Sequence, residues 1–182
     1  MKNIFKISVL LFIGLSFVVS SCKKEEVLID GCTDITAMNY QDLATNNNGS
    51  CIFAYGIAQG QWDIETACED LSISIPFFLD TLVPLNDLFP NSIEIMGVGE
   101  GVVSLDINGS TILADIANDG AVTIQDDQKI SLDTGDFGIL DVGITGSGNI
   151  ETSTNGDLTL YLTIVIPATT TNVPSCEITF SK

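Results

Sequence analysis

The stretch VSLDINGSTILADI, residues 103–116, decides the fold class of this chain. From Val103 to Ile107 every second residue is apolar and the residues between are polar, the period-two pattern of a half-buried β-strand. Asn108-Gly109 then provides the strongest short-range hairpin signal, and apolar alternation resumes over 112–116. The stretch therefore predicts two antiparallel strands with one face in a core and one in water.

The same pattern extends in both directions. Asn118-Asp119-Gly120 predicts another turn, and a strand with alternating leucines is expected to begin at the turn Asn155-Gly156-Asp157 and to stop at Pro167. Its expected partner is 141–150, where three glycines indicate a bend or a strongly coiled strand. Further strands are expected at 61–68, 71–75, 92–98, 129–132 and 176–180. Residues 55–182 are thus predicted to form an all-β antiparallel meander of about eight to ten strands, either a barrel or a β-sandwich.

The composition fits one β-rich domain and restricts its partners. The 182-residue chain has 24 acidic residues, six lysines, no arginine and no histidine, with a net charge of −18. Nucleic acid is not an expected partner, because its affinity depends on lysine and arginine neutralising phosphates. The 45% hydrophobic content is enough for a packed core.

The residue types also restrict the chemistry. Without histidine there is no Ser-His-Asp or Cys-His arrangement, and no P-loop motif occurs. No cofactor, metal or enzymatic activity is expected. A carboxylate glycosidase, with two inward acids about 5–10 Å apart, is the remaining catalytic alternative; the adjacent acids Asp126-Asp127 are expected at a solvated turn.

The first 21 residues have the organisation of a signal peptide. Lys2 and Lys6 precede the apolar stretch Ile7 to Val19, which is followed by Ser20 and Ser21. This 13-residue stretch is shorter than the roughly 20 residues that span a bilayer as a helix. The segment is therefore predicted to be removed on export.

Residues 19–26 carry two resemblances. Val19-Ser20-Ser21-Cys22 resembles a bacterial lipobox, with valine in place of the usual leucine; this implies that Cys22 becomes an acylated N-terminus bearing chains such as palmitate. Cys22-Lys23-Lys24-Glu25-Glu26 resembles the surface-export signal of Bacteroidota lipoproteins, which implies exposure on the outer membrane. The alternative to the lipobox is an ordinary signal peptide with an incidental cysteine. The alternative to the export signal is a plain charged tether over 22–30, with the protein on the periplasmic face.

Residues 31–53 contain GCTDITAMNY and ATNNNGSC, at 31–40 and 44–51. They are similar to a short cysteine-bounded motif of Bacteroidota surface proteins, sometimes compared with calcium-binding repeats. This copy has Ile35 in place of proline and Asn47-Asn48 in place of an acidic pair. Chiefly Asp34 and Asp42 remain as carboxylate donors, so a structural clip is favoured over a calcium site.

The cysteine count allows a pairing scheme. An acylated Cys22 leaves four cysteines, for which three pairings are possible. The module resemblance implies Cys32 with Cys51, which leaves Cys68 with Cys176. That second bridge would tie the first strand of the domain to its last.

Gly60-Gln61-Trp62 resembles the Gly-x-Trp of lipocalin-like barrels, where the tryptophan plugs one end. It favours a lipocalin-like barrel slightly over a sandwich, although ordinary core packing is the alternative. The basic residue that commonly covers that tryptophan has only Lys129 and Lys182 as candidates.

Residues 76–90 show no clear period and contain three prolines. We expect a long connection, with one helical turn, folded over a barrel end. The functional alternative is a hydrophobic lip around a ligand pocket, formed by Phe77, Phe78, Leu82, Leu85 and Phe89. Asp80-Thr81-Leu82 also resembles the Bacteroidota O-glycosylation acceptor, with Thr81 as the modified residue.

These patterns favour a non-enzymatic surface lipoprotein whose acidic β-domain binds a small molecule, a glycan or another protein. A structural or adhesive envelope component is the alternative, and the glycosidase is the second.

Overall fold

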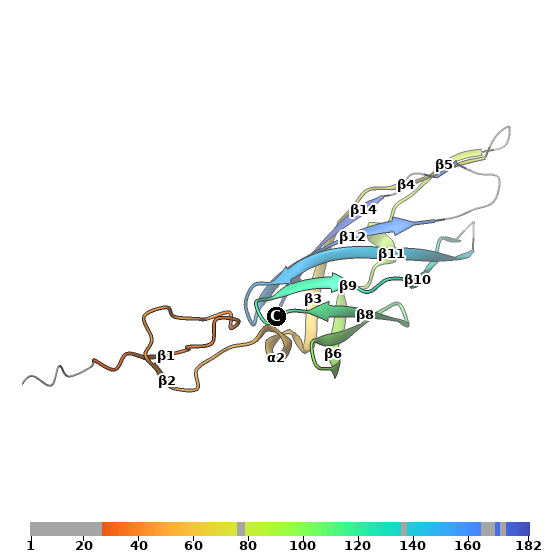
Figure 1. Ribbon diagram of the computed structural model, residues 1–182. Helices are drawn as coiled ribbons and strands as arrows, with labels where there is room; N and C mark the ends of the chain where they lie inside the picture. The colour runs from red at the N-terminus through yellow and green to blue at the C-terminus, as the bar shows by residue number, and fades with distance from the viewer. Residues whose placement is uncertain (1–26, 76–78, 136–137, 165–169, 172–173) are drawn as a thin grey trace, which may run out of the picture.

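In a computed structural model the chain is all-β, with an eight-stranded antiparallel closed barrel and an extra strand (Figure 1). The structure describes residues 27–75, 79–135, 138–164, 170–171 and 174–182. Around the barrel each strand pairs with its neighbour, and β14 pairs with β3 to close the ring. The barrel strands are β3 (Gly60–Cys68), β6 (Ser92–Gly99), β7 (Val102–Ile107), β8 (Ser110–Ile116), β9 (Ala121–Ile124), β11 (Ile139–Ile150), β12 (Asn155–Thr163) and β14 (Ser175–Ser181).

Closure of the ring decides between the barrel and the sandwich. Phe180 of β14 pairs with Ile64 of β3, and Ser147 of β11 pairs with Thr123 of β9. With both pairings formed, the sheet returns on itself, which is how antiparallel barrels reduce the number of exposed strand edges.

One barrel position is filled by two short strands. β11 pairs first with β10 (Gln128–Asp133) and then, further along, with β9. The break between β9 and β10 contains Asp126-Asp127, and Asp127 has a φ of 60°. The expected turn at these acids is confirmed.

The tight turns follow the predicted glycine positions, with one shift. Asn108 and Gly109 have φ angles of 53° and 80°, the two left-handed positions of a type I′ hairpin. The turn before β12 lies earlier than predicted, since the Glu151 and Thr152 N–H groups both donate to the Asn155 carbonyl. Asn155 therefore begins the strand and 151–154 form the turn.

The glycines of β11 permit its close approach to β12. A side chain at Gly148 would collide with the Asp157 carbonyl, and one at Gly146 with the Thr159 carbonyl. The predicted coiled strand requires glycine here because the neighbouring backbone occupies the space of a Cβ.

A second sheet continues from one end of the barrel. It has the order β13-β4-β5, with β4 (Leu71–Ile75), β5 (Leu79–Val83) and β13 (Thr170–Thr171). A single 3₁₀ turn, η1 (Asn86–Leu88), follows β5. The prediction of a long connection at 76–90 is therefore partly wrong, because 79–83 form a strand. The predicted helical turn is present as η1.

The other end of the barrel carries the amino-terminal module. Its short parallel pair, β1 (Asp30–Gly31) and β2 (Asn46–Asn47), precedes the helix α2 (Ala54–Ala58), which leads into β3. We call the α2 side of the barrel the proximal end, and the side with β4, β5, β13 and η1 the distal end. Figure 1 shows the module and the β4–β5 hairpin at opposite ends of the molecule.

The module contacts the barrel at the turn between β8 and β9. The Asn118 side-chain amide donates to the Thr36 hydroxyl over 3.1 Å, and the Ala54 N–H donates to the Asn118 carbonyl over 3.2 Å. Asn118 therefore links the module to the proximal end.

Candidate functional site

Trp62 closes the proximal end from inside. It is fully buried, and its ring meets that of Phe180 edge-on with centroids 6.1 Å apart. The indole N–H donates to the Ala58 carbonyl over 2.6 Å, so the last residue of α2 satisfies the polar atom of the plug.

Lys182 covers this tryptophan from the last strand. Ser181, the last residue of β14, pairs with Asp63, which brings the following residue, Lys182, beside Trp62. The Lys182 Nζ lies 4.0 Å from the ring centroid and donates to the Ile57 and Gln59 carbonyls over 3.1 and 2.9 Å. Desolvation lowers the pKa of Lys182 below its ordinary value. Of the two lysines considered from sequence, this is the one that covers the ring.

The barrel interior is filled with side chains. Its largest fully buried members include Ile112, Ile130, Leu132, Ile144, Leu160 and Leu162. The gap beside Ala58 and Phe180 has a volume of about 10 Å³, which holds about one water molecule at most. A small molecule has no room in this gap.

Both predicted disulfides are present. Cys32 is bonded to Cys51 within the module, and Cys68 of β3 is bonded to Cys176 of β14. Cys68 and Cys176 are also direct register partners, so the second bridge joins the first and last barrel strands as expected.

The predicted hydrophobic lip does not form from its described members. Leu85 and Phe89 are buried in the core, whereas Leu82 on β5 is 64% exposed. Phe77 and Phe78 lie outside the described residues. Leu85 and Phe89 flank η1, so they anchor that turn to the barrel and do not border a pocket.

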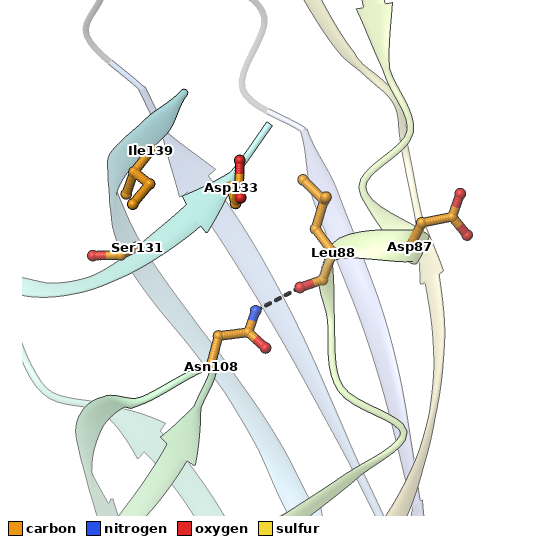
Figure 2. A pocket seen from close by; sticks show the side chains of 6 residues that line it. All are labelled: Asp87, Leu88, Asn108, Ser131, Asp133 and Ile139. Atoms are coloured by element: carbon orange, nitrogen blue, oxygen red, sulfur yellow. Dashed lines mark hydrogen bonds between the residues drawn. The ribbon is translucent and has the colours of Figure 1, made fainter. Parts of the chain in front are cut away.

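The distal end has a shallow hollow instead, with a volume of about 370 Å³ (Figure 2). Four chain segments meet there: η1, the β7–β8 turn, β10 and the start of β11. The Asn108 side-chain amide donates to the Leu88 carbonyl over 2.5 Å and fixes η1 against the hairpin. The lining residues are Asp87, Leu88, Asn108, Ser131, Asp133 and Ile139.

The hollow is lined by both polar and apolar side chains. In Figure 2 the Asp87 carboxylate points away from the other lining residues, while Ser131 and Asp133 lie along β10. The Ser131 hydroxyl donates to the Asp141 carboxylate over 3.0 Å. Ile139, 71% exposed, provides an apolar wall. Sequence reasoning missed this hollow because its residues lie on four separate segments and share no motif.

None of the carboxylates among the described residues is buried. Ser104 is the one buried polar side chain there, so no acid points into the core. Within the same residues no three potential metal ligands gather.

Asp34, one of the two acids of the module considered for calcium, is occupied locally. Its carboxylate accepts hydrogen bonds from the Thr36 N–H and hydroxyl over 2.9 and 2.8 Å. The backbone bond, followed by the hydroxyl bond, holds the pKa of Asp34 below its ordinary value. The carboxylate thereby closes a turn next to the disulfide.

Comparison with known proteins identifies no family. No family model matches the chain, and no curated protein matches it. Among solved structures, a redesigned β-barrel aligns over 72% of this chain and 96% of its own length, with 8% identity and a TM-score of 0.32. This likeness is too distant to support an argument about function. None of the helices in the described ranges is long and apolar enough to span a membrane.

Proposed function

We propose that this chain is a non-enzymatic lipoprotein of the cell envelope, anchored through acylated Cys22, whose barrel presents its distal end to a binding partner outside the outer membrane. The observation that carries the proposal is the division of the molecule into two ends. The chain enters through the module at the proximal end, and the hollow and the second sheet lie at the distal end (Figure 1).

The anchor rests on the sequence motif around Cys22. Several acyl chains, at about 0.8 kcal/mol for each buried methylene, hold a protein on a bilayer essentially permanently. The four remaining cysteines are all paired as disulfides, which agrees with an oxidising compartment outside the cytoplasm.

The partner class follows from the distal surface. The filled barrel supports an external site, and the hollow combines amide, hydroxyl and carboxylate groups with the apolar side of Ile139. Four lysines against 24 acids on the mature chain disfavour anionic ligands. We expect an uncharged glycan or a polypeptide segment free of acidic residues.

Metabolic labelling with an alkyne fatty acid tests the anchor. The native chain should be labelled, and the Cys22→Ala chain should not. Native protein that remains unlabelled would contradict the lipoprotein assignment. Cleavage by protease added to whole cells then distinguishes surface exposure from a periplasmic location.

Binding to cells that display the full chain tests the distal site. Asn108→Ala combined with Ile139→Ser should reduce capture of a neutral glycan panel or of acid-free peptides. Thr159→Ala combined with Tyr161→Ala changes the outer barrel wall and serves as the matched control. Equal capture by both variants would exclude the hollow as the site.

A structural or adhesive role is the second candidate, favoured by β5. In the described residues β5 pairs with a strand on one side, β4, so its other backbone edge is open. Open edges accept further strands. Thr81→Pro should then weaken cell–cell adhesion, and unchanged adhesion would exclude this route.

A further inference from the structure

The exposed apolar side chains of this protein are concentrated in one small segment. Thirteen large apolar residues are exposed in the described ranges, and eight of them lie between Val27 and Phe53. The barrel and the distal sheet together carry the other five. Exposed apolar residues that gather in one region, and are not scattered singly, indicate an interaction surface.

Three of these residues belong to neighbouring chain segments. Ile29 accepts hydrogen bonds from the Thr45 and Asn46 N–H groups over 2.9 and 3.1 Å, and its own N–H donates to the Thr45 hydroxyl over 3.0 Å. This pairing brings the segment that contains Val27 and Leu28 beside the one that contains Leu43. Their side chains are 77%, 68% and 70% exposed, respectively. We call these three residues the anchor patch.

The length of chain before the patch limits how far it can lie from the membrane. Val27 lies five positions after Cys22, with four residues between them. A fully extended chain of that length spans at most about 18 Å, and the headgroup layer on each side of a bilayer is about 5–8 Å thick. An acylated Cys22 therefore keeps Val27 within about 18 Å of the anchored residue, close enough for the anchor patch to reach the headgroups.

We infer that the anchor patch inserts into the headgroup region of the membrane that holds the acyl chains. The inference rests on the proposed lipid anchor. The acyl chains supply the attachment, and the patch orients the module so that the distal end faces away from the bilayer. Without the patch the acyl chains alone would not fix the orientation of the protein.

The charge of the module sets which lipid surface it fits. Asp30, Asp34 and Asp42 lie between residues 27 and 53, and no lysine does. Anionic lipids repel acidic segments, as they attract basic ones. The patch should therefore contact zwitterionic phosphatidylcholine vesicles more closely than vesicles containing phosphatidylglycerol.

Tryptophan scanning on the acylated full-length protein in vesicles tests this inference. Leu28→Trp and Leu43→Trp place the probe in the anchor patch, and Ile139→Trp places it at a site of matched exposure, 71% against 70% for Leu43. The single native tryptophan, Trp62, is fully buried and provides a constant background. Brominated phosphatidylcholine then reports contact with lipid by quenching.

The expected result is quenching and a shift to shorter wavelength for the two patch probes, with neither for Ile139→Trp. Vesicle-bound protein whose patch probes are quenched no more than the Ile139→Trp probe would overturn the inference and leave the anchor intact. An emission shift that depends on protein concentration, and not on lipid, would overturn the inference and indicate that the patch binds a second copy of the protein. If the acylated protein did not stay bound to the vesicles, the result would instead contradict the lipid anchor itself.

Discussion

The two ends of the barrel close the same seam between β3 and β14 by different means. At the proximal end Trp62, Phe180 and Lys182 form a plug from aromatic contact, a cation over the ring and hydrogen bonds to backbone carbonyls. At the distal end a disulfide joins Cys68 to Cys176 at paired positions. The proximal end is therefore held by several non-covalent contacts between side chains, and the distal end by a single covalent bond.

The difference matches what each end carries. Between β3 and β6 the chain leaves the barrel to form β4, β5 and η1, and between β12 and β14 it leaves again to form β13. Both excursions begin at the distal end, next to the disulfide. A covalent bond holds the strand register there whatever the inserted segments do.

The largest expected effect comes from removing the distal closure. Cys68→Ala with Cys176→Ala opens a loop with a sequence separation of 108, and a loop of about 100 residues corresponds to about 4.7 kcal/mol of unfolding free energy. Chemical denaturation followed by Trp62 fluorescence measures the loss.

The module disulfide provides the control for that experiment. Cys32→Ala with Cys51→Ala opens a separation of 19, for which the same relation gives about 3 kcal/mol. We expect this loss to act on the module and to leave the Trp62 transition of the barrel nearly unchanged. Equal shifts of that transition in both variants would show that the two disulfides are not independent.

A smaller effect distinguishes core from surface at the distal end. Leu85→Ala should lower the unfolding free energy by about 2–5 kcal/mol, because Leu85 is fully buried. Leu82→Ala, three residues earlier and exposed, should change it by less than about 0.5 kcal/mol. If denaturant titrations gave similar losses of unfolding free energy for the two variants, Leu85 would not be a core residue and would again be a candidate for the hydrophobic lip.

At the proximal end, Lys182→Met removes the cation and its two hydrogen bonds but keeps a long apolar stem. Because Lys182 is exposed, the expected loss is about 1 kcal/mol. Denaturant unfolding measures it, and Lys129→Met is the control, since Lys129 lies on β10, away from the plug. Losses of equal size would mean that stacking over Trp62 contributes nothing specific.

The smallest effect concerns the pH response of the module. The pKa of Asp34 is lowered in the fold, so its ionised form stabilises the module above the ordinary pKa of 3.8 and this contribution is lost as pH falls through the lower folded value. Thr36→Val removes the hydroxyl donor and should raise the pKa of Asp34 part of the way, because the backbone donor remains. Carboxyl NMR titration reads the change. Thr45→Val should leave it unaltered, and an equal rise there would exclude the Thr36 contact as the cause.

Local signals in the sequence predicted the elements well. Alternation of apolar residues marks strands because successive side chains point to opposite faces, and Asn108-Gly109 marks a hairpin because both positions require a positive φ. The Cys68–Cys176 bond was predicted because the module resemblance implied Cys32 with Cys51 and left these two cysteines, and the structure confirms it. Leu82, Leu85 and Phe89 were not separable, because the segment has no clear period.

The sequence by itself determined most of the barrel strands, the Asn108-Gly109 hairpin and the acidic composition, because each depends on nearby residues or on composition. The cysteine pairing came from the resemblance of residues 31–53 to a known module. Only the tertiary structure decided that the sheet closes, that Lys182 reaches Trp62 and that four segments form the distal hollow. These features join residues far apart in the chain. They depend on the register in which distant strands pair, and no local sequence pattern predicts that register.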